Sequence, residues 1–309
     1  MGGGSVVRQR KRRFLQGEPE SSGRKKKRAE ARELVRAFGE YELFRVERGR
    51  YELIKGGVVV GTFSDAQADR ERVLFPLSRG MLLEVSENGV REIIAPEKAV
   101  LMGLIASDGS YGFRRTVHSR GKGYRTDYRT EFWSEDKELI DVFNNLVERT
   151  YAKIPHHYVD KRDNTISSRV YSKEVFYDLN GFKLKPEPYE FNVPRGHLDE
   201  EGKRAFLKGF FSGDGCVCKS KKKKDDVKVW FYSKSKRGTE ELHQTLKDLG
   251  FHPFEIKRRK TPEGRMFYGF MISAKEHIKF IEEIGSYKPR HMQIFEKMRR
   301  KKTRGGRKE

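Results

Sequence analysis

Apolar and polar positions follow the same order of elements twice between residues 97 and 300. Each copy opens with an apolar helical run and continues with alternating strand-length segments and amphipathic helices. The first copy predicts a helix opened by Pro96, strands 110–118 and 124–133, helix 136–151, strands 154–160 and 165–171, and helix 173–179. The second predicts a helix from Asp199 or Glu200, strands 215–219 and 227–233, helix 239–249, strands 254–259 and 266–273, and helices 274–284 and 290–300. We therefore expect an α+β fold of two pseudo-symmetric αββαββα repeats, each with a four-stranded antiparallel sheet.

The first hundred residues have a different pattern. Residues 1–30 are rich in Gly, Ser, Lys and Arg, which predicts a disordered arm, and residues 29–38 have a short helical pattern. Short alternating bursts between glycine turns predict strands 41–46, 51–54, 58–63, 81–85 and 90–94, with a short helix at 65–72. The expected division is a basic arm 1–37, a small α+β or all-β module 38–96 of unknown role, repeats 97–183 and 199–298, a linker 184–198 and a basic tail 299–309.

Two segments are copies of one another and end in the same acid. Residues 101–109 read Leu-Met-Gly-Leu-Ile-Ala-Ser-Asp-Gly, and residues 207–215 read Leu-Lys-Gly-Phe-Phe-Ser-Gly-Asp-Gly. Asp108 aligns with Asp214 at a separation of 106 residues, which is too long for a solenoid unit and suits a duplicated half-domain. One carboxylate per copy predicts a symmetric site where two acids meet. The plainer alternative is two unrelated buried helices that both end in Asp-Gly.

The ends of these two helices favour a paired site. Glycine after a helix usually forms a left-handed cap, which we expect at Gly109 and Gly215. Aspartate at a helix C-terminus is electrostatically unfavourable, and two such ends together need a cation between them. Small residues four positions apart let two backbones approach closely; they are Gly103 with Ser107 and Gly209 with Gly213. We expect the two helices to pack in close contact with Asp108 and Asp214 side by side.

Hard carboxylate oxygens at such a point predict a magnesium site. Mg²⁺ keeps several of its waters and takes only one or two carboxylates, which Asp108 and Asp214 provide. The backbone carbonyls of Ser107 and Gly213, expected to be free at the helix ends, are candidate further ligands. Bound divalent ions can activate water, stabilise a leaving oxygen and neutralise charge at phosphorus, as phosphodiester hydrolysis requires.

The composition points to a polyanionic partner. The 309 residues include 67 Lys and Arg against 45 Asp and Glu, a net charge of +22. Residues 1–37 and 287–309 each carry +8, whereas residues 38–96 carry −2. The ends are therefore expected to contact phosphate, although a basic ribosomal-type protein has a similar charge. The cysteines Cys216 and Cys218 lack partners at zinc spacing and are interpreted as reduced thiols. No run of 18 apolar residues exists, so we expect no membrane insertion and a cytoplasmic, nucleoid-associated location.

On these residues the chain resembles the LAGLIDADG homing endonucleases, of the monomeric two-repeat, archaeal intron-encoded type. The resemblance rests on the two repeated segments and on two flanking stretches, Phe191-Asn-Val-Pro-Arg-Gly with Glu201-Gly-Lys-Arg-Ala-Phe206, and Ile284-Gly-Ser-Tyr-Lys-Pro-Arg-His-Met292. It covers about residues 97–298, and residues 1–96 resemble nothing we can name. Ala106 stands where the motif has its first Asp, a position that is not the metal-binding one.

The resemblance implies a site-specific, double-strand DNA cut within a long asymmetric site. It implies overlapping active sites at the minor groove, short 3′ overhangs, and Mg²⁺ or Mn²⁺ as cofactor with Asp108 and Asp214 as catalytic acids. Lys234 matches the basic residue that the second strand of each sheet delivers, while Glu135 stands at the matching place of the first repeat. Lys288, and Lys183 or Lys185, are weaker candidates at the repeat ends.

DNA contacts are expected on alternate strand residues of both sheets, which would form a saddle over the duplex. The candidates are Arg114, His118, Arg125, Tyr128, Arg129, Arg162, Arg169, Lys221, Lys228, Trp230, Lys257, Arg259, Tyr268 and Lys288. The run 221–224 at a hairpin tip is interpreted as a phosphate contact. An alternative on the same scaffold is a non-cleaving protein, either a maturase that holds intron RNA or a transcription regulator. A third is an unrelated basic RNA-binding protein, which would not explain the repeated Asp-Gly ends.

Overall fold

The computed structural model describes residues 33–38, 41–47, 50–64, 72–86, 89–117, 124–160, 165–219 and 227–305. Two compact units, Met1–Ala66 and Gln67–Glu309, are described separately. The described part of the first unit is an antiparallel sheet whose strands follow chain order: β1 (Glu33–Phe38), β2 (Tyr41–Glu47), β3 (Arg50–Lys55) and β4 (Val58–Ser64). Gly56 and Gly57 make the β3–β4 turn with positive φ, which glycine adopts without strain.

One prediction for the N-terminal region differs from the structure, and another lies almost wholly outside the described residues. The described part of the predicted helix 29–38 is strand β1, so that prediction is wrong. Pairing with β2 along the strand from Glu33 to Phe38 outweighs a weak helical pattern. The predicted helix 65–72 lies outside the described residues except Arg72, which begins a strand that was not predicted, β5 (Arg72–Pro76). The strands predicted at 41–46, 51–54, 58–63, 81–85 and 90–94 are confirmed.

The second unit opens with a three-stranded sheet of β5, β6 (Met81–Ser86) and β7 (Gly89–Ile94), with a 3₁₀ turn η1 (Ser78–Gly80) before β6. A buried charge links this sheet to the first repeat. The Nζ atom of Lys98 lies 2.7 Å from Asp178 Oδ2 and 3.4 Å from Met81 Sδ. The hydroxyl of Tyr151 donates to the same carboxylate at 2.6 Å. Lys98 is fully buried, so this pairing is what makes its position tolerable.

The first repeat has the predicted order. It comprises α2 (Pro96–Asp108), β8 (Gly109–Val117), β9 (Tyr124–Ser134), α3 (Lys137–Tyr151), β10 (His156–Val159), β11 (Ile166–Tyr171) and α4 (Lys173–Gly181). Its antiparallel sheet has the strand order β10-β11-β9-β8. The helices cover one face of the sheet, where Phe132 on β9 and Phe143 on α3 stack with ring centroids 5.2 Å apart.

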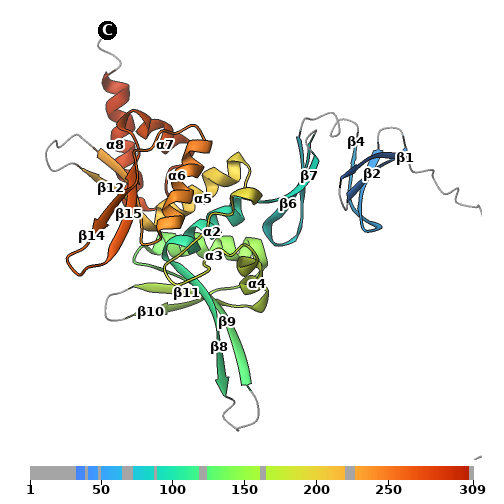
Figure 1. Cartoon of the computed structure of the whole chain (residues 1–309), viewed down its shortest axis with the longest axis horizontal. Helices are drawn as coiled ribbons and strands as arrows, with labels where there is room; N and C mark the ends of the chain where they lie inside the picture. Colours follow the sequence, from blue (N-terminus) through green and yellow to red (C-terminus); the bar gives the residue numbers. More distant parts are fainter. Residues whose placement is uncertain are drawn as a thin grey trace, which may run out of the picture. The chain divides into compact units, whose positions relative to one another are not determined.

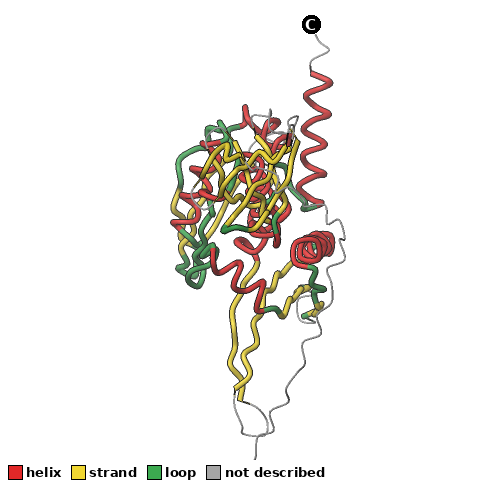
Figure 2. The backbone as a smooth tube through the Cα atoms, turned by 90° about the vertical axis from the view of Figure 1, so that its right-hand side faces the viewer, coloured by secondary structure: helices red, strands yellow, loops and turns green. Residues whose placement is uncertain are grey.

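The second repeat follows the 3₁₀ turn η2 (Arg195–His197). It comprises α5 (Glu200–Asp214), β12 (Gly215–Lys219), β13 (Val227–Ser233), α6 (Lys236–Asp248), β14 (Lys257–Lys260), β15 (Met266–Met271), a 3₁₀ turn η3 (Ala274–Glu276), α7 (His277–Glu283) and α8 (Pro289–Gly305). Its sheet order is β12-β13-β15-β14, so the predicted fold class of two αββαββα-like repeats is confirmed (Figure 1). In Figure 2 the final helix α8 extends beyond the sheets, and β8 and β9 form a long hairpin.

Helices α2 and α5 pack against one another at the centre of this unit (Figure 1). An added Cβ at Gly103 would lie 2.2 Å from the carbonyl oxygen of Phe206, and one at Gly209 would lie 2.2 Å from that of Val100. An added Cβ at Gly213 would lie 2.1 Å from Ser107 Oγ. The expectation of two closely packed motif helices is therefore confirmed, because no side chain larger than hydrogen fits at these positions.

The glycines after these two helices have another role than the one expected. Gly109 has φ −101° and Gly215 has φ −70°, so neither is a left-handed cap and that prediction is wrong. Glycine is needed there for space, since the chain turns sharply from helix into strand. An added Cβ at Gly109 would lie 2.6 Å from Ile105 Cα, and one at Gly215 would lie 2.2 Å from the carbonyl oxygen of Phe211. Each acid is thus the last helical residue before a strand starts.

Two further expectations concern membrane-spanning helices and the cysteines. No helix among them combines the length and apolar character needed to span a bilayer. Cys216 and Cys218 on β12 are free thiols, as expected.

Candidate metal and DNA site

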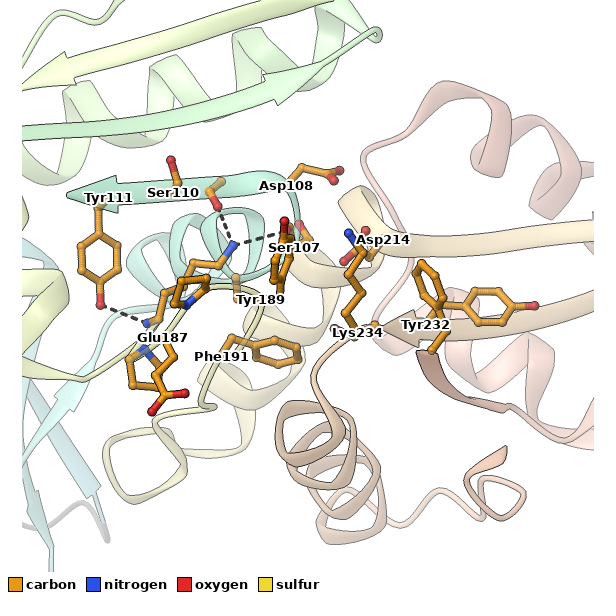
Figure 3. Close-up of a pocket in the computed structure, with 17 residues that line it drawn as sticks. Ser107, Asp108, Ser110, Tyr111, Glu187, Tyr189, Phe191, Asp214, Tyr232 and Lys234 are labelled. Atoms are coloured by element: carbon orange, nitrogen blue, oxygen red, sulfur yellow. Dashed lines mark hydrogen bonds between the residues drawn. The ribbon is translucent and has the colours of Figure 1, made fainter. Parts of the chain in front are cut away.

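The two motif acids share one open cavity of about 630 Å³ (Figure 3). Asp108 and Ser107 reach it from the end of α2, and Asp214 reaches it from the end of α5. The residues that line it are Ala106 to Tyr111, Lys185 to Tyr189, Phe191, Asp214, Tyr232, Ser233, Lys234 and Phe267. Figure 3 shows both acids between Tyr111 on one side and Lys234 and Tyr232 on the other. The linker between the repeats therefore contributes one wall of the cavity.

The carboxylates of Asp108 and Asp214 lie close enough for their negative charges to repel one another. Burial, and then the charge of Asp108, raise the pKa of Asp214 to about 7. The pKa of Asp108 is also raised, chiefly because the surrounding protein displaces water, although the side chain keeps an exposed edge. Lys185 and Lys288 lower both values without cancelling the rise. Because the two acids interact, they titrate as a pair.

Two lysines from the repeat ends occupy equivalent places beside the acids. The Nζ atom of Lys288 donates to the carbonyl oxygen of Gly213 at 3.0 Å and lies 3.9 Å from Asp136 Oδ2. The Nζ atom of Lys185 donates to the carbonyl of Gly109 at 2.5 Å and lies 3.5 Å from that of Ser107. Burial lowers the pKa of both ammonium groups.

The carbonyl oxygens of Ser107 and Gly213 were expected to be free, but each is contacted by the Nζ atom of a lysine. Each carbonyl oxygen has a second lone pair, so it can coordinate a metal ion while a lysine contacts it. Lys183 and Lys185 were alternative candidates at the end of the first repeat. Lys185 lines the cavity, whereas Lys183 is exposed.

Lys234 reaches the cavity from the end of β13. Its Nζ atom lies 4.4 Å from the ring centroid of Tyr189 in the linker, and its charge lowers the pKa of Asp214. Tyr189 is exposed and has φ +69°, a conformation that non-glycine residues adopt at a cost. Sequence reasoning missed Tyr189, since only the tertiary fold brings the linker over β13. Glu135, the counterpart of Lys234 in the first repeat, is exposed.

Hydrogen bonds fix the segment that carries Lys288. The Oγ atom of Ser212 on α5 accepts from the backbone N–H of Tyr287 at 2.8 Å and lies 3.3 Å from Ser286 Oγ. Ser286 Oγ also lies 3.1 Å from Nδ1 of the buried His291, whose pKa burial lowers to about 3. In the first repeat a different contact does this work, since the backbone N–H of Lys185 donates to the hydroxyl of Tyr111 at 3.0 Å.

The donor set at the cavity fits a hard cation with few protein ligands. Among the described residues no group of three or more His, Cys, Asp or Glu side chains is placed to hold a metal, so only the acid pair is available. The raised pKa of Asp214 shows a net cost of ionising both acids, and a cation between them would relieve it. Mg²⁺ and Mn²⁺ suit oxygen ligands, and Mg²⁺ retains several waters.

Strand register decides which predicted DNA contacts share the face of each sheet that the helices leave uncovered. In the first sheet, Ser110 pairs with Glu131, which pairs with Arg169, and Arg114 pairs with Asp127. Arg114, Arg125, Arg129 and Arg169 therefore share this uncovered face. Tyr128 lies one position off it and packs 5.2 Å from Phe176 of α4. His118 and Arg162 lie outside the described residues.

Acids hold the arginines of the first sheet. The buried Glu131 carboxylate lies 3.1 Å from Arg129 Nη2 and 3.1 Å from Arg169 Nε. Asp127 lies 2.6 Å from Arg125 Nε.

The uncovered face of the second sheet carries cations and aromatic rings. Lys228, Trp230 and Tyr232 on β13 share it with Lys257 and Arg259 on β14. Trp230 is buried, with Arg259 over its ring at 4.8 Å. Tyr268 pairs with Ser233 and Arg258, one position off this face. Lys288 is buried in the acid cavity region, and Lys221 lies outside the described residues.

The comparison with protein families finds a match within the second repeat. Residues 201–285 match the model of the LAGLIDADG-like domain. No curated protein sequence matches the chain.

Among solved structures, mesophilic variants of the homing endonuclease I-DmoI are 24% identical with a TM-score of 0.45, covering 62% of this chain and 95% of that one. I-DmoI in complex with DNA and Mn is 23% identical with a TM-score of 0.45, covering 62% and 96%. The I-LtrWI LAGLIDADG homing endonuclease bound to target DNA is 17% identical with a TM-score of 0.42, covering 67% and 91%. The family match thus lies in the segment that begins with α5 and contains Asp214.

Proposed function

We propose that the chain is a metal-dependent DNA endonuclease that makes a double-strand break at a specific, long and asymmetric site. The observation that carries this proposal is the convergence of Asp108 and Asp214 from two equivalent helices on one open cavity. A protein that only bound nucleic acid would gain nothing from two adjacent carboxylates, since they repel phosphate. Two equivalent acids suit a duplex, because each of its two strands then meets one of them.

The acid pair would hold Mg²⁺ or Mn²⁺, with the remaining positions taken by water and DNA phosphate. When bound, the divalent ion supplies an activated water and charge neutralisation at phosphorus. Asp108 and Asp214 must be ionised for this, and the raised pKa of Asp214 makes its ionisation the more demanding of the two. Ser107 and Gly213 offer carbonyl oxygens beside the acids.

Three lysines would act on the phosphate and on protons. Lys185 and Lys288 hold positive charge against the helix ends, where an approaching phosphate needs compensation. Among the described residues Lys234 forms no close ion pair; its charge acts on Asp214, and its Nζ atom lies over the ring of Tyr189. It is the group best placed to exchange a proton with the water or the leaving oxygen, so we assign it the general acid-base role.

DNA would bind along the uncovered faces of the two sheets. The net charge of +22 and the exposed arginines and lysines on these faces supply phosphate and base contacts. Because the two faces carry different side chains, a single chain would recognise an asymmetric site, and no second copy is needed to complete the acid pair.

Incubation of the purified chain with plasmid DNA that carries the intron-less insertion site tests the proposal. With Mg²⁺ or Mn²⁺ we expect linear product with short 3′ overhangs, and with EDTA we expect binding without cutting. Tight binding to this DNA with no linear or nicked product in either metal would contradict the endonuclease and favour the non-cleaving alternatives, a transcription regulator or an intron RNA maturase.

A further inference from the structure

A second, smaller cavity opens on the uncovered face of the second sheet. It has a volume of about 290 Å³, and its walls include Trp230, Tyr232, Lys257, Arg259, Phe267 and Gly269. We call it the aromatic pocket. Tyr232 and Phe267 also line the acid cavity, so the two cavities adjoin.

A glycine makes room for the rings of the aromatic pocket. Tyr232 pairs with Gly269 across β13 and β15, and an added Cβ at Gly269 would lie 2.8 Å from Tyr232 Cδ1. Without a side chain at Gly269 the tyrosine ring can lie over β15. Trp230 and Tyr232 are nearly parallel, with an interplanar angle of 9° and centroids 5.3 Å apart. Because Trp230 is buried beneath Arg259, the partly exposed rings of Tyr232 and Phe267 are the aromatic surfaces that the pocket offers to a ligand.

Positively charged side chains lie beside these rings, and the described strands of this sheet carry no acid. The four strands β12 to β15 contain no Asp or Glu, and Lys257 and Arg259 are exposed. Arg259 lies over the Trp230 ring at 4.8 Å. In the first sheet the position equivalent to Trp230 is Glu131, which binds two arginines. The first sheet also has a cation over aromatic rings, Arg169 over Trp133 and Tyr158, but Glu131 balances its charge, and the described strands of the second sheet contain no such acid.

We propose that the aromatic pocket binds an unpaired DNA base by stacking, with the adjoining phosphate held by Lys257 and Arg259. The proposal rests on the proposed function, since that places DNA on this face of the sheet. It names a chemical class of ligand, a planar base attached to an anionic backbone.

Stacking, and not groove-edge contact, is what these side chains offer. Base edges in the major groove are recognised by hydrogen bonds and, at thymine, by contact with the methyl group, whereas the pocket presents the faces of aromatic rings. A base inside a duplex has both π faces covered by its neighbours, so only a base outside the stack can use the rings. Unstacking costs a few kcal/mol. Because the pocket adjoins the acid cavity, an extruded base here would lie beside the cutting site.

The chain allows a direct optical test. It contains two tryptophans, Trp133 on β9 and Trp230 in the pocket, so Trp133→Phe leaves Trp230 as the single reporter. This protein is titrated with oligothymidylate and with an abasic oligonucleotide of equal length and charge. Stacking contributes roughly 1–3 kcal/mol per base, so we expect the thymidylate to bind about tenfold more tightly or better and to quench Trp230. Equal affinity and equal quenching with the abasic chain would overturn the proposal.

Three variants separate stacking from charge in the same background. Tyr232→Leu should remove most of the preference for the base-bearing strand, and Phe267→Leu should do the same if Tyr232→Leu fails to fold. Lys257→Gln should weaken both oligonucleotides by the same factor, because it removes only a phosphate contact. A base preference that survives both aromatic substitutions would place the stacking elsewhere and overturn the proposal.

A third arm distinguishes an unpaired base from a paired one. Duplex DNA with a single bulged thymidine should quench Trp230 more per molecule bound than the same duplex without the bulge. Equal quenching by the two duplexes would mean that the rings contact the groove, which also overturns the proposal. None of these readouts involves cleavage, so their failure would leave the proposed endonuclease intact, and a failure to cut DNA would leave the stacking result standing.

Discussion

The two repeats are nearly alike where their helices meet and unlike on the faces that their sheets leave uncovered. At the helix pair, an added Cβ at Gly103 or at Gly209 would lie 2.2 Å from a carbonyl oxygen of the other helix, that of Phe206 or of Val100. On the sheets, Glu131 with its two arginines stands where the second repeat has Trp230 beneath Arg259. The two helix backbones are in contact at these positions, so only glycine fits and both repeats carry the same residue. The sheet faces carry no such restriction, and the two repeats therefore differ in the side chains that they present there.

The same contrast holds around the acid cavity. Lys185 and Lys288 occupy equivalent places, but Lys234 in the second repeat is opposite in charge to Glu135 in the first. The linker adds Tyr189 beside Lys234. The two acids are thus equivalent in their backbone setting and unequal in their neighbours, which predicts one site with two unequal strand-cutting centres.

The largest expected effect concerns the part that the repeats share. Gly103→Ala and Gly209→Ala should each lower the free energy of unfolding by about 3 kcal/mol or abolish folding, since an added methyl meets backbone in both cases. Denaturant unfolding measures this, with Gly112→Ala as the control because nothing lies within 4 Å of its added Cβ. If only one of the two helix glycines proved sensitive, the symmetry of the helix pair would be broken.

A second prediction sharpens the difference between the two cutting centres. Lys234→Met should slow cleavage of one DNA strand by about 100-fold, because that centre loses its general acid-base group. Glu135→Gln should change neither strand rate by much. Strand-specific end labels would show nicked DNA accumulating with the lysine variant. Equal slowing of both strands would mean that Lys234 serves the whole cavity.

The third prediction concerns pH and the cost of ionising the acids. The pKa of Asp214 rises on folding from about 4 in the unfolded chain to about 7. The contribution of Asp214 to stability should therefore fall as the pH rises from about 4 to 7. The lowered pKa of His291 acts in the opposite direction, so the difference between the wild type and Asp214→Asn isolates the effect of Asp214. At pH values above 7, Asp214→Asn should be more stable than the wild type by on the order of 2 kcal/mol, and this advantage should vanish below about pH 4.

Added Mg²⁺ gives the converse. It should stabilise the wild type above pH 7 and leave Asp214→Asn nearly unchanged, because the variant lacks one ligand. Thermal unfolding with and without the metal measures both effects. Asp127→Asn, which lies outside the acid cavity, is the control and should respond to Mg²⁺ as the wild type does. A variant at position 214 that gained as much from the metal as the wild type would argue against Asp214 as a ligand.

The smallest expected effect lies on the first sheet. Glu131→Gln removes the carboxylate that Arg129 and Arg169 share, and should cost about 1–2 kcal/mol of stability. It should also release arginine charge toward DNA and steepen the slope of log K against log salt by about one unit. Asp127→Asn, which breaks an exposed pair, should have a smaller effect on stability. An unchanged salt slope would mean that the arginines released from Glu131 do not reach phosphate.

The central features of the fold could be predicted because local pattern and repetition both encode them. The small residues Gly103 and Gly209 predicted a close helix pair, and the duplicated Asp108 and Asp214 predicted that two acids share one place. The alternation of strand residues predicted both sheets. In these cases a single physical requirement selects the residue type.

Other features depend on tertiary placement that pattern does not encode. Tyr128 and Tyr268 were expected with the DNA-facing residues, but a shift of one position along a strand reverses its face, and the register places both on the opposite one. Tyr189 reaches Lys234 only because the linker folds over β13. From the sequence, Lys185 and Lys288 were weaker candidates than Lys234. Their contact with the carbonyls at the helix ends depends on tertiary hydrogen bonds, from Lys185 to Tyr111 and from Tyr287 to Ser212, which the sequence pattern does not reveal.

Cleavage by Asp108→Asn and Asp214→Asn tests the central claim most directly. Each variant is compared with the wild type for cutting and for binding of one cognate DNA in Mg²⁺. We expect both variants to bind this DNA about as well as the wild type and to yield no linear product, because each loses one ligand charge and keeps the sheets. Linear product from either variant at the wild-type rate would contradict a shared, metal-dependent site at the ends of α2 and α5.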